Sequence, residues 1–296
     1  MNTLEFMPIT LESRAVIMPF LAQEEFAISD IIFGNLYIWR VAREISYAIS
    51  YDTLLLQTKY ANKDPYFFFP IGAGDKAQAL KALESYVKEQ GFVLHFESLE
   101  SKNLPLLQRL FPNLKTMARQ ERFDYVYSIS ELIALSGRKY HKKKNHLNQF
   151  LQTYSGQWHY EPISQQNIPA IITAANQWLA THPAPTKDLQ LENQGIQEAL
   201  QAYVSLDLRG GVVYVNDEIA AFSFGEVMND KMVVIHIEKA APHITGAYQI
   251  INQQLLANAF SAFVYANREE DLGIEGLRRA KKSYNPVFMV EKYAML

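Results

Sequence analysis

Residues 263–286 read FVYANREEDLGIEGLRRAKKSYNP. This pattern predicts a short apolar strand over 263–266, a polar corner over 267–271 and then a helix. The helix ends before Pro286, because proline disfavours helical geometry in the residue before it. A last strand is predicted over 287–295. The helix carries four cations: Arg278, Arg279, Lys281 and Lys282. Such a density beside an acidic corner indicates a site for an anionic substrate, and the alternative is a solvated basic helix face.

The composition is that of a globular protein. Of 296 residues, 49% are hydrophobic and 20% are charged, a balance that excludes disorder over most of the chain. The length suits one large domain or two of ordinary size. Because the formal net charge is −3, any binding to a polyanion must come from local basic clusters.

Several classes of site and location are excluded by what the sequence lacks. Cysteine is absent, which removes disulfides and thiolate chemistry and agrees with a reducing compartment. The seven histidines show no metal-ligand spacing with a third ligand nearby, so no metal site is predicted. The N-terminal residues lack the pattern of a signal peptide, and no apolar run approaches the ~18 residues that span a bilayer. We expect a cytoplasmic protein without a transmembrane segment, and the oligomeric state stays open.

The two halves of the chain repeat the same order of elements at an offset of roughly 165 to 175 residues. The recurring elements are strand 66–69 with 232–239, helix 76–90 with 248–260, strand 92–96 with 263–266, helix 104–111 with 274–283, and strand 123–127 with 288–293. We place the junction at Gly137, which gives domains 1–136 and 137–296. The sequence therefore predicts an α/β (α+β) fold of two tandem units, each a mixed, mostly antiparallel sheet flanked by helices.

A strongly basic segment follows this junction. Residues 137–151 read GRKYHKKKNHLNQFL, with five cations within seven positions: Arg138, Lys139, Lys142, Lys143 and Lys144. At helical spacing these cations cannot all face one way, so some must be solvated. The segment predicts contacts to phosphates, either of a transfer RNA or of an anionic lipid head group. The alternative is a surface helix without a ligand.

Several blocks of sequence resemble those of one protein family. The blocks are DYVY at 124–127, GRKYHKKKNHLNQF at 137–150, GAYQIIN at 246–252, NREEDLG at 267–273, GLR at 276–278 and KKSYNP at 281–286. Together with the element order, they resemble the C-terminal soluble domain of phosphatidylglycerol lysyltransferases, which has a tandem GNAT-like fold. More distantly, Lys281 and Tyr284 resemble the Lys-x-x-aromatic element of the Fem aminoacyltransferases. The chain departs from the lysyltransferases in lacking their membrane-spanning portion.

The resemblance implies an acyl- or aminoacyltransferase. The donor would be aminoacyl-tRNA or acyl-CoA, the acceptor an amine or hydroxyl, which includes a lipid head group, and no cofactor would be bound covalently. Such chemistry needs alignment of the reactants and a hydrogen-bond donor for the developing oxyanion. The alternative is a non-catalytic duplicated scaffold that binds an anionic ligand or a protein partner.

The resemblance also suggests roles for residues of the second half. Lys281 would stabilise the oxyanion with Tyr284 beside it, or it would pair with the acidic corner and only fix that corner. Arg278 would hold a donor phosphate, and Asp271 is grouped with the substrate-binding residues. The remaining candidates are the loop residues Gly246, Ala247 and Tyr248 for a pyrophosphate, and the strand carboxylates Glu226 and Glu238 as general bases.

Overall fold

The computed structural model describes residues 4–181 and 183–296, which form two compact units. The first unit comprises Met1–Phe123 together with Val290–Leu296, and the second comprises Asp124–Met289. Each unit is built on its own seven-stranded sheet of mixed direction. The predicted α/β fold of two tandem units with mixed sheets and flanking helices is therefore confirmed.

The first unit has the strand order β1-β2-β3-β4-β5-β14-β6. Its strands are β1 (Met7–Pro8), β2 (Glu44–Ser50), β3 (Thr53–Lys59), β4 (Tyr66–Phe67), β5 (Phe96–Leu99), β6 (Thr116–Ala118) and β14 (Tyr293–Met295). Its helices are α1 (Arg14–Leu21), α2 (Phe33–Trp39), α3 (Lys76–Glu89) and α4 (Leu104–Leu110). Helix α3 begins where the Asp75 carboxylate accepts a hydrogen bond from the Gln78 amide, and it buries Leu80 and Leu83 in the core.

The second unit has the strand order β13-β7-β12-β11-β10-β9-β8. Its strands are β7 (Asp124–Ser128), β8 (Trp158–Pro162), β9 (Arg209–Val215), β10 (Glu218–Val227), β11 (Met232–Ala240), β12 (Tyr265–Asn267) and β13 (Phe288–Val290). Its helices are α5 (Ile129–Ala134), α6 (His141–Thr153), α7 (Ile168–Ala180), α8 (Lys187–Gln201), α9 (Ala247–Ala259) and α10 (Glu275–Lys282).

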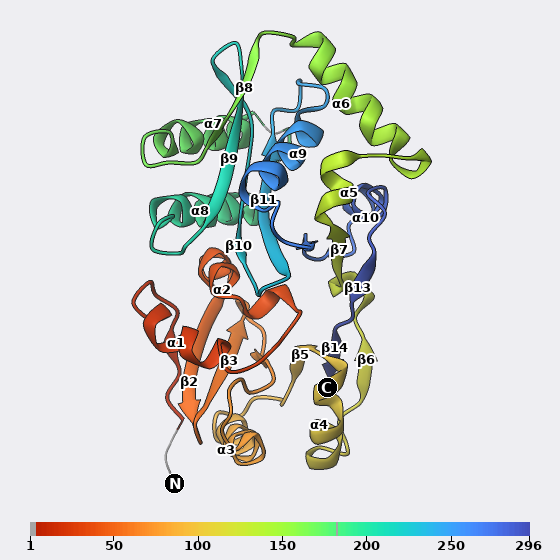
Figure 1. Ribbon diagram of the computed structural model, residues 1–296. Coiled ribbons are helices and arrows are strands. Elements are labelled where there is room, and N and C mark those ends of the chain that lie inside the picture. The colour runs from red at the N-terminus through yellow and green to blue at the C-terminus, as the bar shows by residue number, and fades with distance from the viewer. Residues whose placement is uncertain (1–3, 182) are drawn as a thin grey trace. The chain divides into compact units, whose positions relative to one another are not determined.

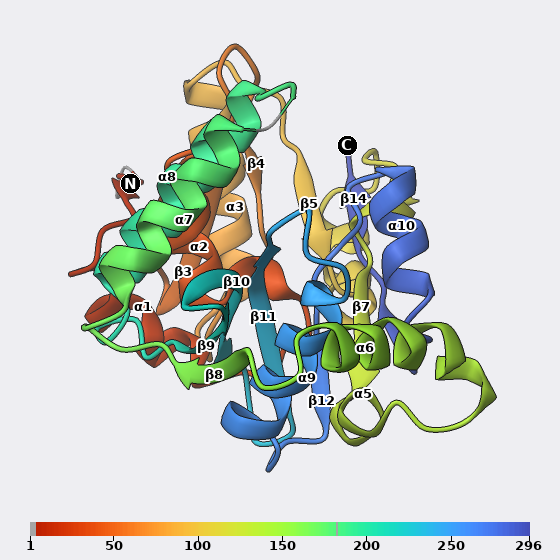
Figure 2. The ribbon, with the colours of Figure 1, turned by 90° about the horizontal axis from the view of Figure 1, so that it is seen from above.

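The helices of the second unit cover its sheet in two groups (Figure 2). Helices α7 and α8 lie side by side, and Trp178 of α7 stacks on Phe222 of β10 with ring centroids 5.7 Å apart. Helix α9 packs on β9, β10 and β11 together with α5 and α6, and Ile250, Leu255 and Phe150 are buried there. This second group matters for the site, because α6 brings the basic segment onto α9.

The units do not divide where the sequence predicts. The chain changes unit at 123/124 and again at 289/290, instead of once at 136/137. The cause is that the predicted last strand 287–295 is two strands in different sheets, β13 in the second and β14 in the first. Figure 1 shows the blue strand β14 among the yellow strands β5 and β6. Buried contacts hold β14 and the residue before it in the first unit. Met295 lies in the core of that unit, and Lys292 forms a buried ion pair with Asp30.

Candidate functional site

Two parallel strands at the centre of the second sheet separate partway along their length. Met232–Val234 of β11 pair with Tyr265–Asn267 of β12, but β11 then continues alone to Ala240. The corner, residues 267–271, leads the chain away from β11 at that point. Beyond this point, side chains rather than backbone groups connect β11 with the corner. Oε1 of Glu238 accepts a hydrogen bond from Nη2 of Arg268 at 2.8 Å.

A buried histidine makes a second connection across the same separation. Nδ1 of His236 lies 2.8 Å from Oε1 of Glu269, and Nε2 lies 2.8 Å from Oε1 of Glu226 on β10. A proton on each ring nitrogen satisfies both carboxylates, so the imidazolium is the form that suits this geometry. Burial alone would lower the pKa of His236, but the hydrogen bonds to the two carboxylates raise it to about 9.

Lys281 supports the corner from the side of α10. Its ammonium donates to the carbonyl oxygens of Arg268, Glu269 and Glu270 at 2.5, 3.0 and 2.6 Å. All three ammonium donors are thus used, and Glu269 has a left-handed φ of 58° that such contacts help to hold. Burial lowers the pKa of Lys281 to about 8, so the ammonium still prevails at neutral pH. Lys281 therefore binds the corner through its carbonyl oxygens, and the charges of Glu269 and Glu270 also favour its ammonium form.

Asp271 and Arg278 bind each other. Nε and Nη2 of Arg278 donate to the two carboxylate oxygens of Asp271 at 2.8 and 2.9 Å. The hydroxyl of Tyr125 and the amide of Gly273 also donate to this carboxylate. Burial would raise the pKa of Asp271, but the hydrogen bonds lower it to about 2. This fork-shaped pairing with Asp271 uses Nε and Nη2 of the Arg278 guanidinium. The role of Arg278 in holding a donor phosphate stays a prediction.

Stacked cations and rings lie beside the corner. The Arg268 guanidinium is 4.7 Å from the ring centroid of Tyr284 and 5.4 Å from that of Tyr127. Nζ of Lys143, on α6, lies 3.9 Å from the centroid of the Tyr284 ring. Nη1 of Arg268 is buried and has no hydrogen-bond partner within the described part of the chain. Arg268 thus contacts both Tyr284 and Glu238, and Lys143 lies over the same tyrosine ring.

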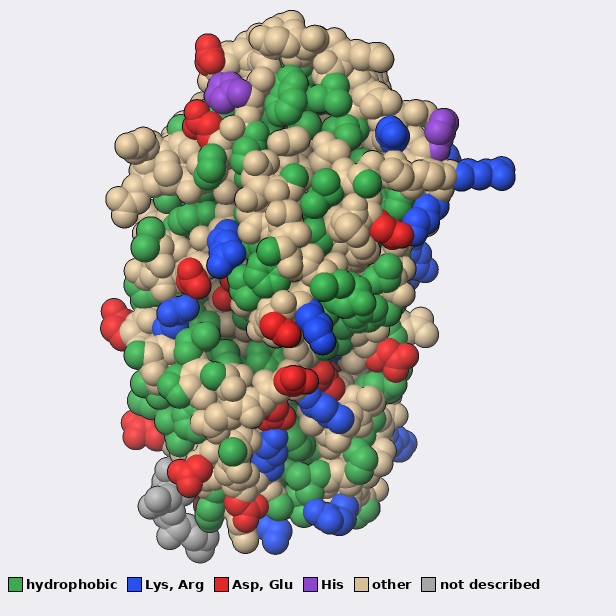
Figure 3. Space-filling view, in the orientation of Figure 1, with side chains coloured by type: hydrophobic (Ala, Val, Ile, Leu, Met, Phe, Trp, Pro, Cys, Tyr) green, Lys and Arg blue, Asp and Glu red, His purple; other side chains and the backbone are tan. Residues whose placement is uncertain are grey.

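The basic segment opens onto a hollow of about 450 Å³, here called the α6 hollow. Its lining residues are Arg138, Lys139, Lys142, Lys143, His146, Ser283 and Asn285. Lys144 lies outside this lining, which agrees with the expectation that the five cations cannot all face one way. Lys139 pairs with Glu131 at 2.8 Å, whereas no described ion pair involves Arg138 or Lys142. Figure 3 shows blue side chains gathered along the edge formed by α6 and α10.

The predicted pyrophosphate loop has a packing role. Gly246 starts α9 with a left-handed φ of 85°, and a Cβ there would lie 2.5 Å from the His146 carbonyl oxygen and 2.7 Å from Cβ of Phe150. The glycine is therefore required by the close approach of α6. Ala247 is buried and Tyr248 is exposed. Binding of a donor phosphate by these three residues stays a prediction.

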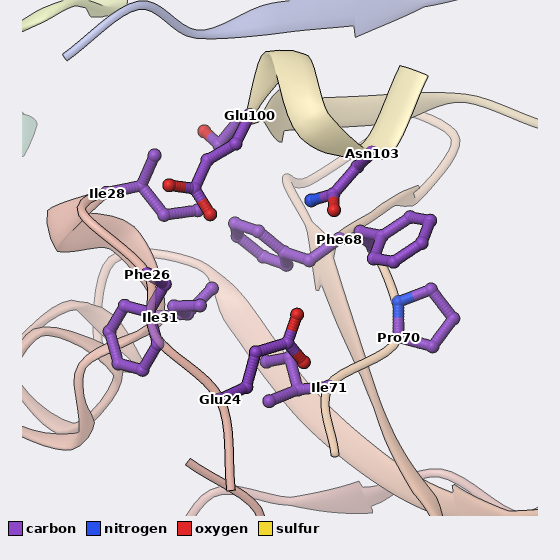
Figure 4. A pocket seen from close by; sticks show the side chains of 11 residues that line it. Glu24, Phe26, Ile28, Ile31, Phe68, Pro70, Ile71, Glu100 and Asn103 are labelled. Atoms are coloured by element: carbon purple, nitrogen blue, oxygen red, sulfur yellow. The ribbon is translucent and has the colours of Figure 1, made fainter. Parts of the chain in front are cut away.

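The corresponding place in the first unit is nearly filled. Between the ends of β4 and β5 lies a cavity of about 20 Å³, which holds about one water molecule. Figure 4 shows the carboxylates of Glu24 and Glu100 directed toward this small space beside Phe68. Glu24 already accepts hydrogen bonds from Lys76 at 2.7 Å and from the Gly72 amide at 3.1 Å. The candidate site is accordingly placed in the second unit.

Sequence reasoning missed His236 and Arg268. A signal for His236 was present, because it precedes Glu238 by two positions on a strand and so shares its face. Arg268 lies two positions after the predicted strand 263–266. Its side chain turns toward Glu238 at the point where β11 and β12 separate. Within residues 4–181 and 183–296, no three His, Cys, Asp or Glu side chains lie where they could share a metal ion. In the same ranges, no helix has the length and apolar character needed to cross a bilayer.

Comparison with known proteins places the chain in a family. Residues 22–296 match the family model described as "Phosphatidylglycerol lysyltransferase, C-terminal". A conserved protein of unknown function from Bacteroides thetaiotaomicron superposes with a TM-score of 0.91 and 31% identity over 99% of both chains. The C-terminal domain of a lysylphosphatidylglycerol synthetase homologue from Agrobacterium fabrum gives 0.66 at 13% identity over 97% of this chain and 92% of that one. FemX gives 0.61 at 11% identity over 98% and 96%.

A curated relative matches a smaller region. The protein MYCGA3080 of Mycoplasmoides gallisepticum is 22% identical over 170 residues, which cover 57% of this chain and 54% of the relative. The match thus spans about half the length of that relative. The two structural likenesses below 25% identity show that this chain shares its fold with those two proteins.

Proposed function

This chain belongs to the family of phosphatidylglycerol lysyltransferase C-terminal domains, and from that premise we propose that it is an aminoacyltransferase. It would transfer an aminoacyl group from aminoacyl-tRNA to an amine or hydroxyl acceptor, such as an anionic lipid head group. The observation that carries the choice of donor is the α6 hollow. Its five basic lining residues, four of them without an ion pair among the described residues, suit the phosphates of a nucleic-acid end.

The reacting ester would lie beside Arg268 and Tyr284. Nη1 of Arg268 is a buried donor without an acceptor among the described residues, and a substrate carbonyl oxygen that reached it would satisfy this donor. In the transition state that oxygen becomes an oxyanion, and a charged donor stabilises it more than it stabilises the ground state. Arg268 thereby takes the role that the sequence suggested for Lys281, whose three donors already bind carbonyl oxygens.

The competing donor is acyl-CoA, which the GNAT-like fold suggests. Its phosphates would need the loop before α9, and there α6 packs against Gly246. The packing of α6 against Gly246 therefore favours aminoacyl-tRNA as the donor. An experiment can distinguish the two donors.

The test is a transfer assay with radiolabelled donors. Charged tRNA and acetyl-CoA are each incubated with the protein and with a panel of amines, hydroxyl compounds and phosphatidylglycerol vesicles, and labelled product is counted. The proposal expects product from charged tRNA only. Product from acetyl-CoA alone would show that the donor is a thioester. Binding of tRNA without product from either donor would show a scaffold without turnover.

A pair of variants ties any activity to the α6 hollow. Arg138→Ala with Lys142→Ala removes two cations of the hollow, and Lys81→Ala with Lys88→Ala removes two exposed cations of α3. Both pairs lower the net charge equally. The proposal expects the first pair alone to raise the KM for charged tRNA. An equal effect of both pairs would mean that the hollow has no special part in donor binding.

A further inference from the structure

Lys143 differs from the other cations of its segment. The side chains of Arg138, Lys139, Lys142 and Lys144 are exposed, whereas Lys143 is half-buried. Its ammonium nitrogen lies over the face of Tyr284, and its stem lines the α6 hollow. One lysine is thus turned from the basic surface toward the corner, at the place where the hollow meets the Tyr284 and Arg268 stack.

The charges that face Lys143 come from several elements. Arg268 of the corner, 4.7 Å from the Tyr284 ring centroid, and Glu238 of β11 act on Lys143 through their charges. Lys139, Lys142 and His146 line the same hollow. Glu238 is bound to Arg268, so these neighbours offer Lys143 an aromatic face and other cations. The pKa of Lys143 is lowered to about 8, mainly by burial and then by the charge of Arg268. The charge of Glu238 has a weaker effect in the opposite direction.

The carboxylates that the sequence suggests as bases are engaged elsewhere. Oε1 of Glu238 accepts from Arg268 at 2.8 Å, and Oε2 accepts from Nδ2 of Asn252 at 3.0 Å. Glu226 is buried and accepts from Nε2 of His236. Both carboxylates thus already accept hydrogen bonds from groups of the chain itself.

We propose that Lys143 is the general base for the acceptor nucleophile, an inference that rests on the proposed function. The neutral amine of Lys143 takes the proton from the acceptor N–H or O–H while the acceptor atom bonds to the ester carbonyl carbon. The bond from that carbon to the ribose oxygen of the tRNA end then breaks. The ammonium of Lys143 returns the same proton to the departing ribose oxygen, so that no other reactant is needed.

The first test is the pH profile of transfer. With charged tRNA as donor, log kcat/KM of the unchanged chain rises with pH and levels off near pH 8, because only the neutral amine acts as base. Lys143→Arg keeps the charge and the stem but cannot lose a proton, and we expect its kcat to fall by about 10²–10⁴-fold with little change in KM. Lys88→Arg, on an exposed face of α3, is the matched control. Full activity of Lys143→Arg would overturn the proposal.

The second test measures the amine without using turnover. Trace labelling with acetic anhydride at pH 6–11, read by mass spectrometry of peptides, gives the reactivity of each lysine as its amine loses its proton. The proposal expects the reactivity of Lys143 to rise with a midpoint near pH 8, because burial lowers the pKa of its amine. A midpoint in the ordinary range of lysine, above pH 10, would overturn the role of Lys143 even where transfer occurs. Absence of transfer by the unchanged chain would instead overturn the proposed function, and with it the role of a base.

Discussion

Oε1 of Glu238 lies 2.8 Å from Nη2 of Arg268, across the point where β11 and β12 cease to pair. Each of the two side chains is only 12% exposed. A buried ion pair therefore spans the separation between the two parallel strands. The pair fixes the guanidinium between two tyrosine rings, and so it orders the place to which we assign the reacting ester.

The first prediction concerns this pair. Glu238→Ala leaves the Arg268 charge buried without its carboxylate, and breaking such a pair typically costs about 3–5 kcal/mol. We expect a loss of that order in the free energy of unfolding, measured by denaturant titration. The double variant Glu238→Leu with Arg268→Met should lose less than the sum of the single changes. Additive losses would show that the two groups do not stabilise each other.

The second prediction separates the two roles considered for Lys281. Lys281→Met removes the donor to three carbonyl oxygens of the corner while keeping the aliphatic stem. An unsatisfied buried acceptor costs about 1–3 kcal/mol, so we expect the Tm to fall by several degrees. Lys282→Met, at the exposed neighbouring position, is the control and should leave the Tm unchanged. A variant Lys281→Met with normal Tm and lost transfer would restore the oxyanion role.

The order of elements could be predicted from the sequence, but the assignment of strands to sheets could not. Apolar runs bounded by glycine or proline predict β11, α9 and α10, because these signals are local in the sequence. Strands β7 and β14 carry no local signal for their partners. Each pairs within the sheet whose other strands come mostly from the opposite half of the chain. Only the long-range packing of residues such as Met295 decides that exchange.

The site could be predicted as a region but not as a set of contacts. The spacing of Lys281 and Tyr284 points to the corner, and in the structure both residues lie beside it. Spacing on α10 could not show that the Lys281 ammonium turns to backbone carbonyls, which no side-chain pattern records. The basic segment likewise gives no sign that Lys143 is the cation turned inward, because that depends on how α6 packs on α9.

The third prediction is a pH dependence that comes from His236. Its pKa is raised from about 6.5 in the unfolded chain to about 9 in the fold. The stability from this group is therefore fully present below pH 6.5 and is lost as the pH rises through about 9. The shift corresponds to on the order of 3 kcal/mol. We expect the difference in unfolding free energy between the unchanged chain and His236→Gln to shrink between pH 6 and pH 9.5.

The control for this titration is His243→Gln, an exposed position outside the site. Its difference from the unchanged chain should stay small and constant with pH. A constant difference for His236→Gln as well would mean that the histidine carries no extra proton in the fold, and that one of the two carboxylates holds the proton instead.

The fourth prediction is a salt dependence. If the α6 hollow binds tRNA phosphates, each lost contact should lower the slope of log K against log salt concentration by about 0.7–0.9. Arg138→Ala with Lys142→Ala should therefore flatten the slope by about 1.4–1.8, while stability changes by less than about 0.5 kcal/mol. Fluorescence anisotropy with labelled tRNA at several salt concentrations measures this. An unchanged slope would show that the basic segment is a solvated surface helix without contacts to tRNA phosphates.

The last prediction distinguishes packing from phosphate binding at Gly246. An alanine there must hold a left-handed φ, and its Cβ would lie 2.5 Å from a backbone oxygen of α6, which cannot move as a flexible side-chain tip can. We expect Gly246→Ala to lower the Tm strongly and to displace α6. Gly276→Ala is the matched control, since its Cβ meets nothing within 4 Å and alanine favours the helix α10. If Gly246→Ala kept its Tm and lost only acetyl-CoA binding, the loop before α9 would be a phosphate loop after all, and the preference for a tRNA donor would lose its support from packing.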